Sequence, residues 1–120
     1  SRDHCQGLGL DIESLLPPAR AERLRAEILT PAEQARMDPN QVDTVVTLTF
    51  SLKESLFKAL YPLVGKRFYF EHAEVLHWSA QGQARLRLLI DLSPQFGSGF
   101  EIDGQFAWLD GHLLSLVAVR

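Results

Sequence analysis

The sequence lacks several features that would place it in a class at once. It has one cysteine among 120 residues, so no internal disulfide can form, which is typical of proteins in a reducing cytoplasm. Its longest apolar runs, such as LLSLVAV, are far shorter than the ~20 residues of a transmembrane helix. The net charge of −3 gives no general attraction to nucleic acid or to an anionic membrane. We therefore expect a cytoplasmic protein with neither kind of partner.

The chain also lacks an initiator methionine, and it enters an apolar run within a few residues of Ser1. We expect it to be part of a longer protein. What is present is ordinary globular composition, with 46% hydrophobic and 22% charged residues, which argues against disorder. Without repeats or linkers, residues 1–120 are predicted to form one domain with one modest core.

The first half predicts a strand followed by helices. LGLDIESL alternates apolar and polar residues, which is the period of a strand. PPARAERLRAEIL predicts a helix of about three turns, and Thr30–Glu33 (TPAE) forms a capping box that starts a second, short helix. From about Val42 to Tyr61 apolar residues recur at helical spacing. We expect one long helix there, ended by Pro62, although VVTLT near its start favours a strand locally.

The second half predicts two hairpins. AEVLHWS and QARLRLLIDL alternate around the turn AQG, and GQFAWL and HLLSLVAV flank Asp110-Gly111, which is typical of a type I′ turn. SPQFGSGFEIDG is predicted to be a loop between the hairpins. The order of strand, helices and meander indicates an α+β fold with the long helix packed on an antiparallel sheet.

The first candidate site residues are Asp11 and Glu13, two positions apart on the predicted strand. Their side chains leave the same face about 6–7 Å apart, close enough to share a hard cation such as Mg²⁺. Gly9, on that face, leaves space for a ligand. The alternative is a half-exposed strand with an acidic, solvated outer face.

The second candidate group is Lys53, Glu54 and Lys58 in the predicted long helix. Glu54 and Lys58 have the spacing of a helix surface pair, worth about 0.2–0.5 kcal/mol. In a functional site, Glu54 would join the two strand carboxylates at the cation, and the lysines would hold phosphate oxygens. Lys53 lies about 100° around the helix from Glu54, so one lysine would flank each side. Lys66 and Arg67 are read as a solvated turn, with phosphate contact as the alternative.

Together the two stretches resemble the signature of the 4′-phosphopantetheinyl transferases, most closely the Sfp-type, enterobactin-synthetase component D-like branch. That family shows a G-(I/V/L)-D-(I/V)-E strand and a later (W/F)-(S/T)-x-K-E-(S/A)-x-x-K helix. Here the motifs are GLDIE (9–13) and FSLKESLFK (50–58), with Phe50 where the family often has Trp. ALYPLVG, FYFEHAEV and DGHLLSLVAV are also similar to that branch. The pair of motifs is specific, whereas either one alone is weak.

The resemblance implies an activity and a role for each candidate residue. The family transfers the phosphopantetheine arm of coenzyme A to a serine of an apo acyl or peptidyl carrier protein and releases adenosine 3′,5′-bisphosphate. By resemblance, Asp11, Glu13 and Glu54 bind Mg²⁺, and Glu54 is also the base for the serine proton. Lys53 and Lys58 are expected to contact CoA phosphates, and Lys58 is grouped with Glu54 as catalytic. Siderophore, polyketide and fatty-acid carriers all fit.

The resemblance also implies an incomplete assembly. Full-length members of this branch are longer chains built as two pseudo-symmetric halves with CoA between them. Residues 1–120 would then be the C-terminal portion, packed against the missing N-terminal half or against a copy of itself. The short holo-acyl-carrier-protein synthases, which trimerise, are the alternative within the superfamily. A fragment that binds Mg²⁺, CoA or the carrier without turnover, and a purely structural domain, are the other functions that these residues allow.

Overall fold

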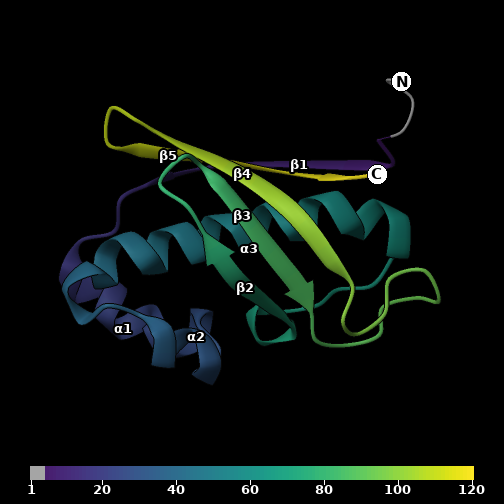
Figure 1. The fold of residues 1–120 in the computed structure, drawn as a ribbon, viewed down its shortest axis with the longest axis horizontal. Coiled ribbons are helices and arrows are strands. Elements are labelled where there is room, and N and C mark those ends of the chain that lie inside the picture. The colour runs from purple at the N-terminus through teal and green to yellow at the C-terminus, as the bar shows by residue number, and fades with distance from the viewer. Residues whose placement is uncertain (1–4) are drawn as a thin grey trace.

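The computed structural model describes residues 5–120 and consists of an antiparallel sheet, one long helix packed on it and a smaller helical corner (Figure 1). The α+β architecture predicted from the sequence is confirmed. No helix in this part of the chain combines the length and apolar character needed to cross a bilayer. The elements, in chain order, are β1 (Gly7–Ser14), α1 (Pro18–Ile28), α2 (Pro31–Arg36), the 3₁₀ helix η2 (Pro39–Gln41), α3 (Val42–Val64), the 3₁₀ helix η3 (Phe70–His72), β2 (Ala73–Trp78), β3 (Gln83–Leu88), β4 (Glu101–Leu109) and β5 (His112–Val119).

The sheet has five strands in the order β1-β5-β4-β3-β2. The last four strands form the predicted meander, and β1 lies antiparallel to β5, from Gly7 opposite Val119 to Ser14 opposite His112. The β4–β5 turn has positive φ at both Asp110 (51°) and Gly111 (77°), as a type I′ turn requires. The strand that carries two candidate carboxylates is therefore fixed along its whole length by the last strand of the fold.

The predicted loop before β4 is too long. Glu101, which lies in its final segment FEIDG, already begins β4 and pairs with Arg87 of β3. The segment alternates as a strand does, with Ile102 and Gly104 buried and Glu101 and Asp103 exposed, although aspartate and glycine are depleted in strands. The pairing with β3 thus extends the strand beyond what its own composition indicates.

The long helix α3 also runs further than predicted. Pro62 does not end it but lies in its last turn, and Gly65 ends it with φ 66°. Proline lacks only the N–H that would bond to the carbonyl of Lys58, while the Gly65 N–H donates to Tyr61 O at 2.8 Å. The glycine in the left-handed region is therefore the helix terminator. The β-branched start of α3 is helical, as predicted.

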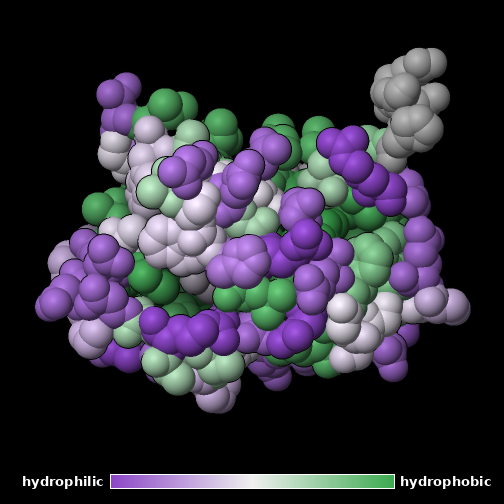
Figure 2. All heavy atoms as spheres, in the orientation of Figure 1, coloured by the Kyte–Doolittle hydropathy of each residue, from purple (hydrophilic) through white to green (hydrophobic). Residues whose placement is uncertain are grey.

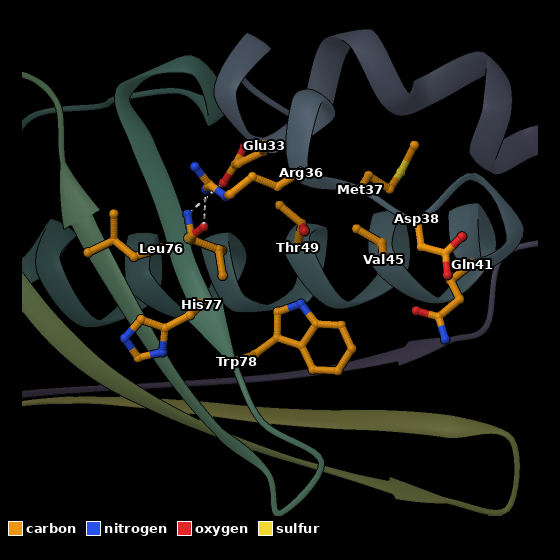
Figure 3. A pocket seen from close by; sticks show the side chains of 11 residues that line it. Glu33, Arg36, Met37, Asp38, Gln41, Val45, Thr49, Leu76, His77 and Trp78 are labelled. Atoms are coloured by element: carbon orange, nitrogen blue, oxygen red, sulfur yellow. Dashed lines mark hydrogen bonds between the residues drawn. The ribbon is translucent and has the colours of Figure 1, made fainter.

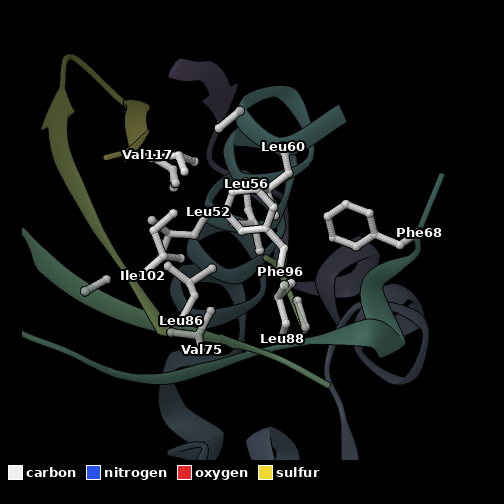
Figure 4. Close-up of a cluster of buried hydrophobic side chains, with 14 of the residues drawn as sticks. Leu52, Leu56, Leu60, Phe68, Val75, Leu86, Leu88, Phe96, Ile102 and Val117 are labelled. Carbon is white, nitrogen blue, oxygen red and sulfur yellow. The ribbon is translucent and has the colours of Figure 1, made fainter. Parts of the chain in front are cut away.

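The core lies between α3 and the inner face of the sheet (Figure 4). The side chains of Leu52, Leu56 and Leu60 are fully buried, and each such burial stabilises the fold by about 1.5–3 kcal/mol. They pack against Leu86, Leu88, Ile102, Val117 and other strand residues. A second buried cluster joins α1 to the first turns of α3 through Ala21, Ile28, Leu29, Val45 and Val46.

Strand β1 turns its carboxylates toward α3 and its large apolar side chains toward solvent, which is the reverse of a typical surface strand. Asp11 is only 6% exposed on the face toward α3, whereas Leu8, Leu10 and Ile12 on the outer face are 53%, 49% and 66% exposed. In the view of Figure 2, hydrophobic residues appear along the upper edge, where Figure 1 places β1, β4 and β5. The alternative of an acidic, solvated outer face is therefore wrong, because the carboxylates lie on the inner face.

Candidate functional site

The site lies where β1 meets the middle of α3, and small residues allow this close approach. A Cβ atom on Gly9 would lie 1.8 Å from the Ser55 carbonyl oxygen. Gly9 therefore makes room for the helix, and the expectation that it leaves space for a ligand is wrong. Nearby, Ser115 Oγ of β5 lies 2.7 Å from the Oγ atoms of both Ser51 and Ser55. These hydroxyl groups satisfy one another inside the contact, as buried polar groups require.

Lys58 joins the helix to the strand. Its Nζ donates to Asp11 Oδ1 at 3.0 Å and to the Leu10 carbonyl at 3.0 Å. The Asp11 side chain is 6% exposed and that of Lys58 is 50% exposed, so this ammonium can reach solvent or a ligand while it stays in contact with Asp11. The i, i+4 spacing predicted a pair with Glu54, but the acid in contact with Lys58 comes from the strand.

The three carboxylates are close enough to disturb one another. Burial, the neighbouring Asp11 carboxylate and the charge of Glu54 raise the pKa of Glu13 to about 7, against the opposing charge of Lys58. Burial and the Asp11 charge also raise the pKa of Glu54, again with Lys58 opposing. The structure therefore brings together Asp11, Glu13, Glu54 and Lys58, four of the five residues singled out from the sequence.

One oxygen of this cluster has no partner. Within the described residues, Asp11 Oδ2 is buried and makes no hydrogen bond. A buried carboxylate oxygen beside two other carboxylates is stabilised by a proton or by a cation. Carboxylate oxygens are the ligands that Mg²⁺ prefers, so the donor set fits that ion. As the side chains lie, however, residues 5–120 contain no group of three His, Cys, Asp or Glu gathered into a metal site.

Lys53 is the candidate that the structure does not bring to the cluster. Its side chain is fully buried, and its Nζ donates to Glu33 Oε1 and to the carbonyl oxygens of Ile28 and Phe70 at 2.9 Å each. An ammonium has three N–H donors, and all three are used. In this geometry Lys53 offers nothing to a phosphate, and this part of the sequence interpretation has no support from the structure.

Hollows adjoin the cluster on the surface. A cavity of about 390 Å³ is lined by Glu54 and Lys58 together with Lys66 and Arg67. Glu13 lines a second hollow, which lies beside α1. The sequence favoured a solvated turn for Lys66 and Arg67, with phosphate contact as the alternative, and the structure places both on the wall of this cavity. Their sequence position could have indicated this. Lys66 and Arg67 directly follow Gly65, which ends α3, and so lie close to the last turns of that helix.

A third cavity of about 300 Å³ lies elsewhere, between α2, the start of α3 and β2 (Figure 3). Glu33 and Arg36 of α2 and Trp78 of β2 are among its lining residues. None of the five site residues predicted from the sequence lines it. The chemistry-bearing residues thus gather at the β1–α3 contact and not at this cavity.

Comparisons with solved structures show the same fold in holo-(acyl-carrier-protein) synthases. The Thermotoga maritima enzyme superposes with a TM-score of 0.69 at 20% identity, over 97% of this chain and 64% of that chain. The Bacillus anthracis str. Ames enzyme, in complex with CoA (3′,5′-ADP), gives 0.60 at 19% identity over 95% of both chains. The Plasmodium yoelii enzyme gives 0.65 at 17% identity, over 96% of this chain and 94% of that one. At such identities these likenesses establish the fold.

The family is established by the sequence. No curated protein matches this chain. The profile of the 4′-phosphopantetheinyl transferase superfamily, however, matches residues 7–113, a range that contains β1, α3 and all the residues of the carboxylate cluster. This chain belongs to the 4′-phosphopantetheinyl transferase superfamily.

Proposed function

We propose that this chain carries out the transfer of the phosphopantetheine arm of coenzyme A to a serine of an apo acyl or peptidyl carrier protein. The observation that carries the proposal is the meeting of Asp11, Glu13, Glu54 and Lys58 around the unpartnered Asp11 Oδ2. The family of transferases to which the chain belongs supports it. So does the named activity of the proteins that share its fold.

In the proposed reaction, the serine oxygen forms a bond to the phosphorus that bears the pantetheine arm. The bond from that phosphorus to the oxygen of adenosine 3′,5′-bisphosphate breaks, and the serine proton needs an acceptor. Glu54 is the proposed acceptor, directly or through water. Burial and the Asp11 charge raise the pKa of Glu54, and a carboxylate with a raised pKa is a stronger base.

Lys58 is the proposed phosphate contact. It is the half-exposed lysine of the cluster, and it lines the cavity of about 390 Å³ together with Lys66 and Arg67. These cations would hold the pyrophosphate of CoA and balance its charge, which is most of what displacement at phosphorus demands of a protein.

Mg²⁺ is the proposed metal ion, held by Asp11, Glu13 and Glu54. When bound, it would supply charge neutralisation at the transferred phosphoryl group. Its support is the donor set of three mutually repelling carboxylates and the unsatisfied Asp11 Oδ2. As the side chains lie, residues 5–120 form no finished metal site, so binding of the ion would require Glu13 and Glu54 to change rotamer.

The finer assignments are also proposals. The GLDIE and FSLKESLFK motifs support the Sfp-type, enterobactin-synthetase component D-like branch, with residues 1–120 as one domain in the C-terminal portion of a two-half enzyme. The exposed apolar face of β1, formed by Leu8, Leu10 and Ile12, supports packing against the missing half or against a second copy. A cytoplasmic location rests on the single cysteine.

A second candidate is a module that binds Mg²⁺, CoA or the carrier without turnover. It is favoured by one observation: the carboxylates are not gathered into a finished metal site within the described residues. This chain spans 64% of the Thermotoga maritima synthase chain.

The test compares transfer of labelled phosphopantetheine to an apo carrier by the wild type, Glu54→Gln and Glu101→Gln. Glu54→Gln should lower the rate at least about 100-fold, because it removes the proton acceptor. Glu101 is an exposed residue of β4, so Glu101→Gln is the matched control and should leave the rate nearly unchanged. Equal rates for both variants would remove Glu54 from the mechanism. Binding of CoA without transfer by the wild type would favour the second candidate.

A further inference from the structure

We propose that Lys53 is a positioning residue, which sets where α3 presents Glu54 to β1 through a buried ion pair with Glu33, and that it does not contact coenzyme A. The proposal rests on the proposed function, because it assigns Glu54 to that site. It also replaces the role that the resemblance implied for this lysine.

The first observation is that the Lys53 ammonium is saturated. Its three N–H donors reach Glu33 Oε1, Ile28 O and Phe70 O at 2.9 Å, and the side chain has no exposed surface. To reach a phosphate it would have to break all three bonds and leave Glu33 as an uncompensated buried charge. Such a loss of one partner is strongly destabilising.

The partner is equally occupied. Glu33 is at the third position of α2, where its Oε1 accepts from the Thr30 N–H at 2.7 Å and completes the capping box. Its Oε2 accepts from the Val75 N–H at 2.5 Å. Figure 3 shows Glu33 with Arg36, whose guanidinium donates to the Val75 carbonyl at 2.8 Å. Two side chains of α2 therefore satisfy the backbone at the outer edge of β2.

The ion pair thus connects five segments of the fold. Through hydrogen bonds of Lys53 and Glu33 it joins α3 to the end of α1, the start of α2, η3 and β2. An apolar side chain at position 53 could slide within such a corner. Three fixed acceptors hold the ammonium at one point, and because the ammonium is attached to α3, they also set the position and rotation of that helix.

The geometry of the helix connects this anchor to the site. Glu54 follows Lys53 directly and projects about 100° further around α3. On the other side of the helix, Lys58 is bound to Asp11 of β1 at 3.0 Å. The middle of α3 is therefore fixed by two ion pairs, one to the helical corner and one to the strand, and Glu54 lies between them. A shift at Lys53 must move Glu54 relative to β1.

The first experiment uses the chain without metal or CoA. In ¹H–¹⁵N spectra the Lys53 ammonium should give a signal that is protected from solvent exchange. The signal can be assigned through the carbons of the same side chain, and Glu33→Gln should shift it. In Lys53→Met, the amide signals of residues 9–13 in β1 should shift, in addition to those of residues 28–33 and 70–75. A lysine that supports only its own corner would leave the β1 signals unmoved.

The second experiment separates KM from kcat in the transfer reaction, well below each variant's Tm. Lys58→Met, which removes a phosphate contact, should raise KM for CoA about tenfold or more. It should also lower Tm, because it leaves the buried Asp11 carboxylate without its partner. Lys53→Met and Glu33→Gln should lower Tm and should change KM for CoA by less than about threefold. They should lower kcat by about tenfold or more, because misplacement of a reacting group by ~1 Å is sufficient for such a loss of rate. Arg85→Met, at an exposed pair on the hairpin, is the neutral control.

Lys53→Met and Glu33→Gln should also act as one unit, so that the double variant loses little more kcat than the worse single variant. The proposal is overturned if Lys53→Met raises KM for CoA as Lys58→Met does while Glu33→Gln has no effect. It is also overturned if the β1 signals do not move. If the wild type transfers nothing, the proposed function fails, and the spectra of the chain alone still decide whether Lys53 positions α3.

Discussion

Asp11 is a carboxylate on the inner face of a strand, where its surroundings only partly compensate its charge. Lys58 binds one of its oxygens at 3.0 Å, and the other is buried without a hydrogen bond. Glu13 and Glu54 add negative charge beside it. Burial and the Asp11 charge raise the pKa of both glutamates. Because this arrangement is stabilised by a proton or a cation, uptake of either should be measurable.

The first prediction concerns pH. The pKa of Glu13 rises from 4.5 to about 7, so the folded chain binds this proton more tightly than the unfolded chain. Without metal, the Glu13 contribution to stability should therefore be greatest below pH 4.5 and fall as pH rises toward about 7. Because Mg²⁺ competes with that proton, the rise in Tm on adding Mg²⁺ should be small below pH 7 and larger above it. Thermal unfolding with and without Mg²⁺ measures both trends.

Glu13→Gln is the matched variant for this experiment, with Glu101→Gln as the control on an exposed strand position. Glu13→Gln should flatten the pH dependence of Tm near neutrality and reduce the effect of Mg²⁺. A Tm shift by Mg²⁺ that is the same on both sides of pH 7, in the wild type and in Glu13→Gln, would show that this carboxylate does not bind the ion.

At the residue scale the sequence identified the cluster but not its environment. The two-residue spacing of Asp11 and Glu13 on a strand was enough to place both on one face, and their motif linked them to Glu54 and Lys58. The burial of Lys53 was not predictable, because its acceptors come from Glu33 and from backbone carbonyls distant in sequence. Helical periodicity gives only the angle between Lys53 and its neighbours.

At the scale of elements, the site depends on how closely α3 approaches β1. The register places Asp11 opposite Ser115, and Ser115 in turn bonds to Ser51 and Ser55 on α3. Glycines in β1 and serines in α3 are thus the reason why carboxylates from a strand and a helix can meet. The same contact brings Lys58 within 3.0 Å of Asp11.

The second prediction tests this approach with Gly9→Ala. The added Cβ would lie 1.8 Å from the Ser55 carbonyl oxygen, so α3 must move away, and the free energy of unfolding should fall by about 3 kcal/mol. The distance between helix and strand should increase, and transfer activity should fall with it. Urea unfolding gives the stability and the transfer assay gives the activity.

Gly97→Ala is the control, because a Cβ there would meet only the Asp91 carboxylate, 3.0 Å away at the end of a flexible side chain. It should cost much less stability than Gly9→Ala and leave transfer unchanged. If the two variants were equally stable and equally active, close packing of α3 on β1 would not be what assembles the site.

The elements themselves were largely predictable where local signals agree. The capping box of Thr30 and Glu33 and the type I′ turn at Asp110 and Gly111 are both confirmed. The errors occurred where tertiary contacts override local signals. Pro62 is accommodated in a last turn that Gly65 closes, and Glu101 is recruited into β4 by pairing with β3.

At the scale of the whole molecule, one face of the sheet is incompletely covered. Leu8, Leu10 and Ile12 are about half or more exposed, at 53%, 49% and 66%. Leu109, on the neighbouring hairpin, is 59% exposed. A contiguous apolar face of this kind is typical of a protein–protein contact. The periodicity of β1 predicted two faces, but it could not show which one faces α3, because that depends on Gly9 and on the packing of the helix.

The third prediction concerns this face. We expect the chain to self-associate through it, so sedimentation velocity should show a concentration-dependent species. The double variant Leu10→Ser/Ile12→Ser should remove that species while changing the free energy of unfolding of the monomer by no more than about 0.5 kcal/mol per site, because both side chains are exposed. A wild type that stays monomeric at all concentrations would contradict self-association and would leave the proposed N-terminal half as the partner of this face.

All the other roles proposed for these residues depend on magnesium-dependent phosphopantetheinyl transfer. The most direct measurement is the intact mass of an apo carrier protein after incubation with this chain, CoA and Mg²⁺. We expect a gain of one phosphopantetheine arm, which EDTA abolishes and excess Mg²⁺ restores. An unchanged carrier mass, both with this chain alone and with an added N-terminal half, would contradict it.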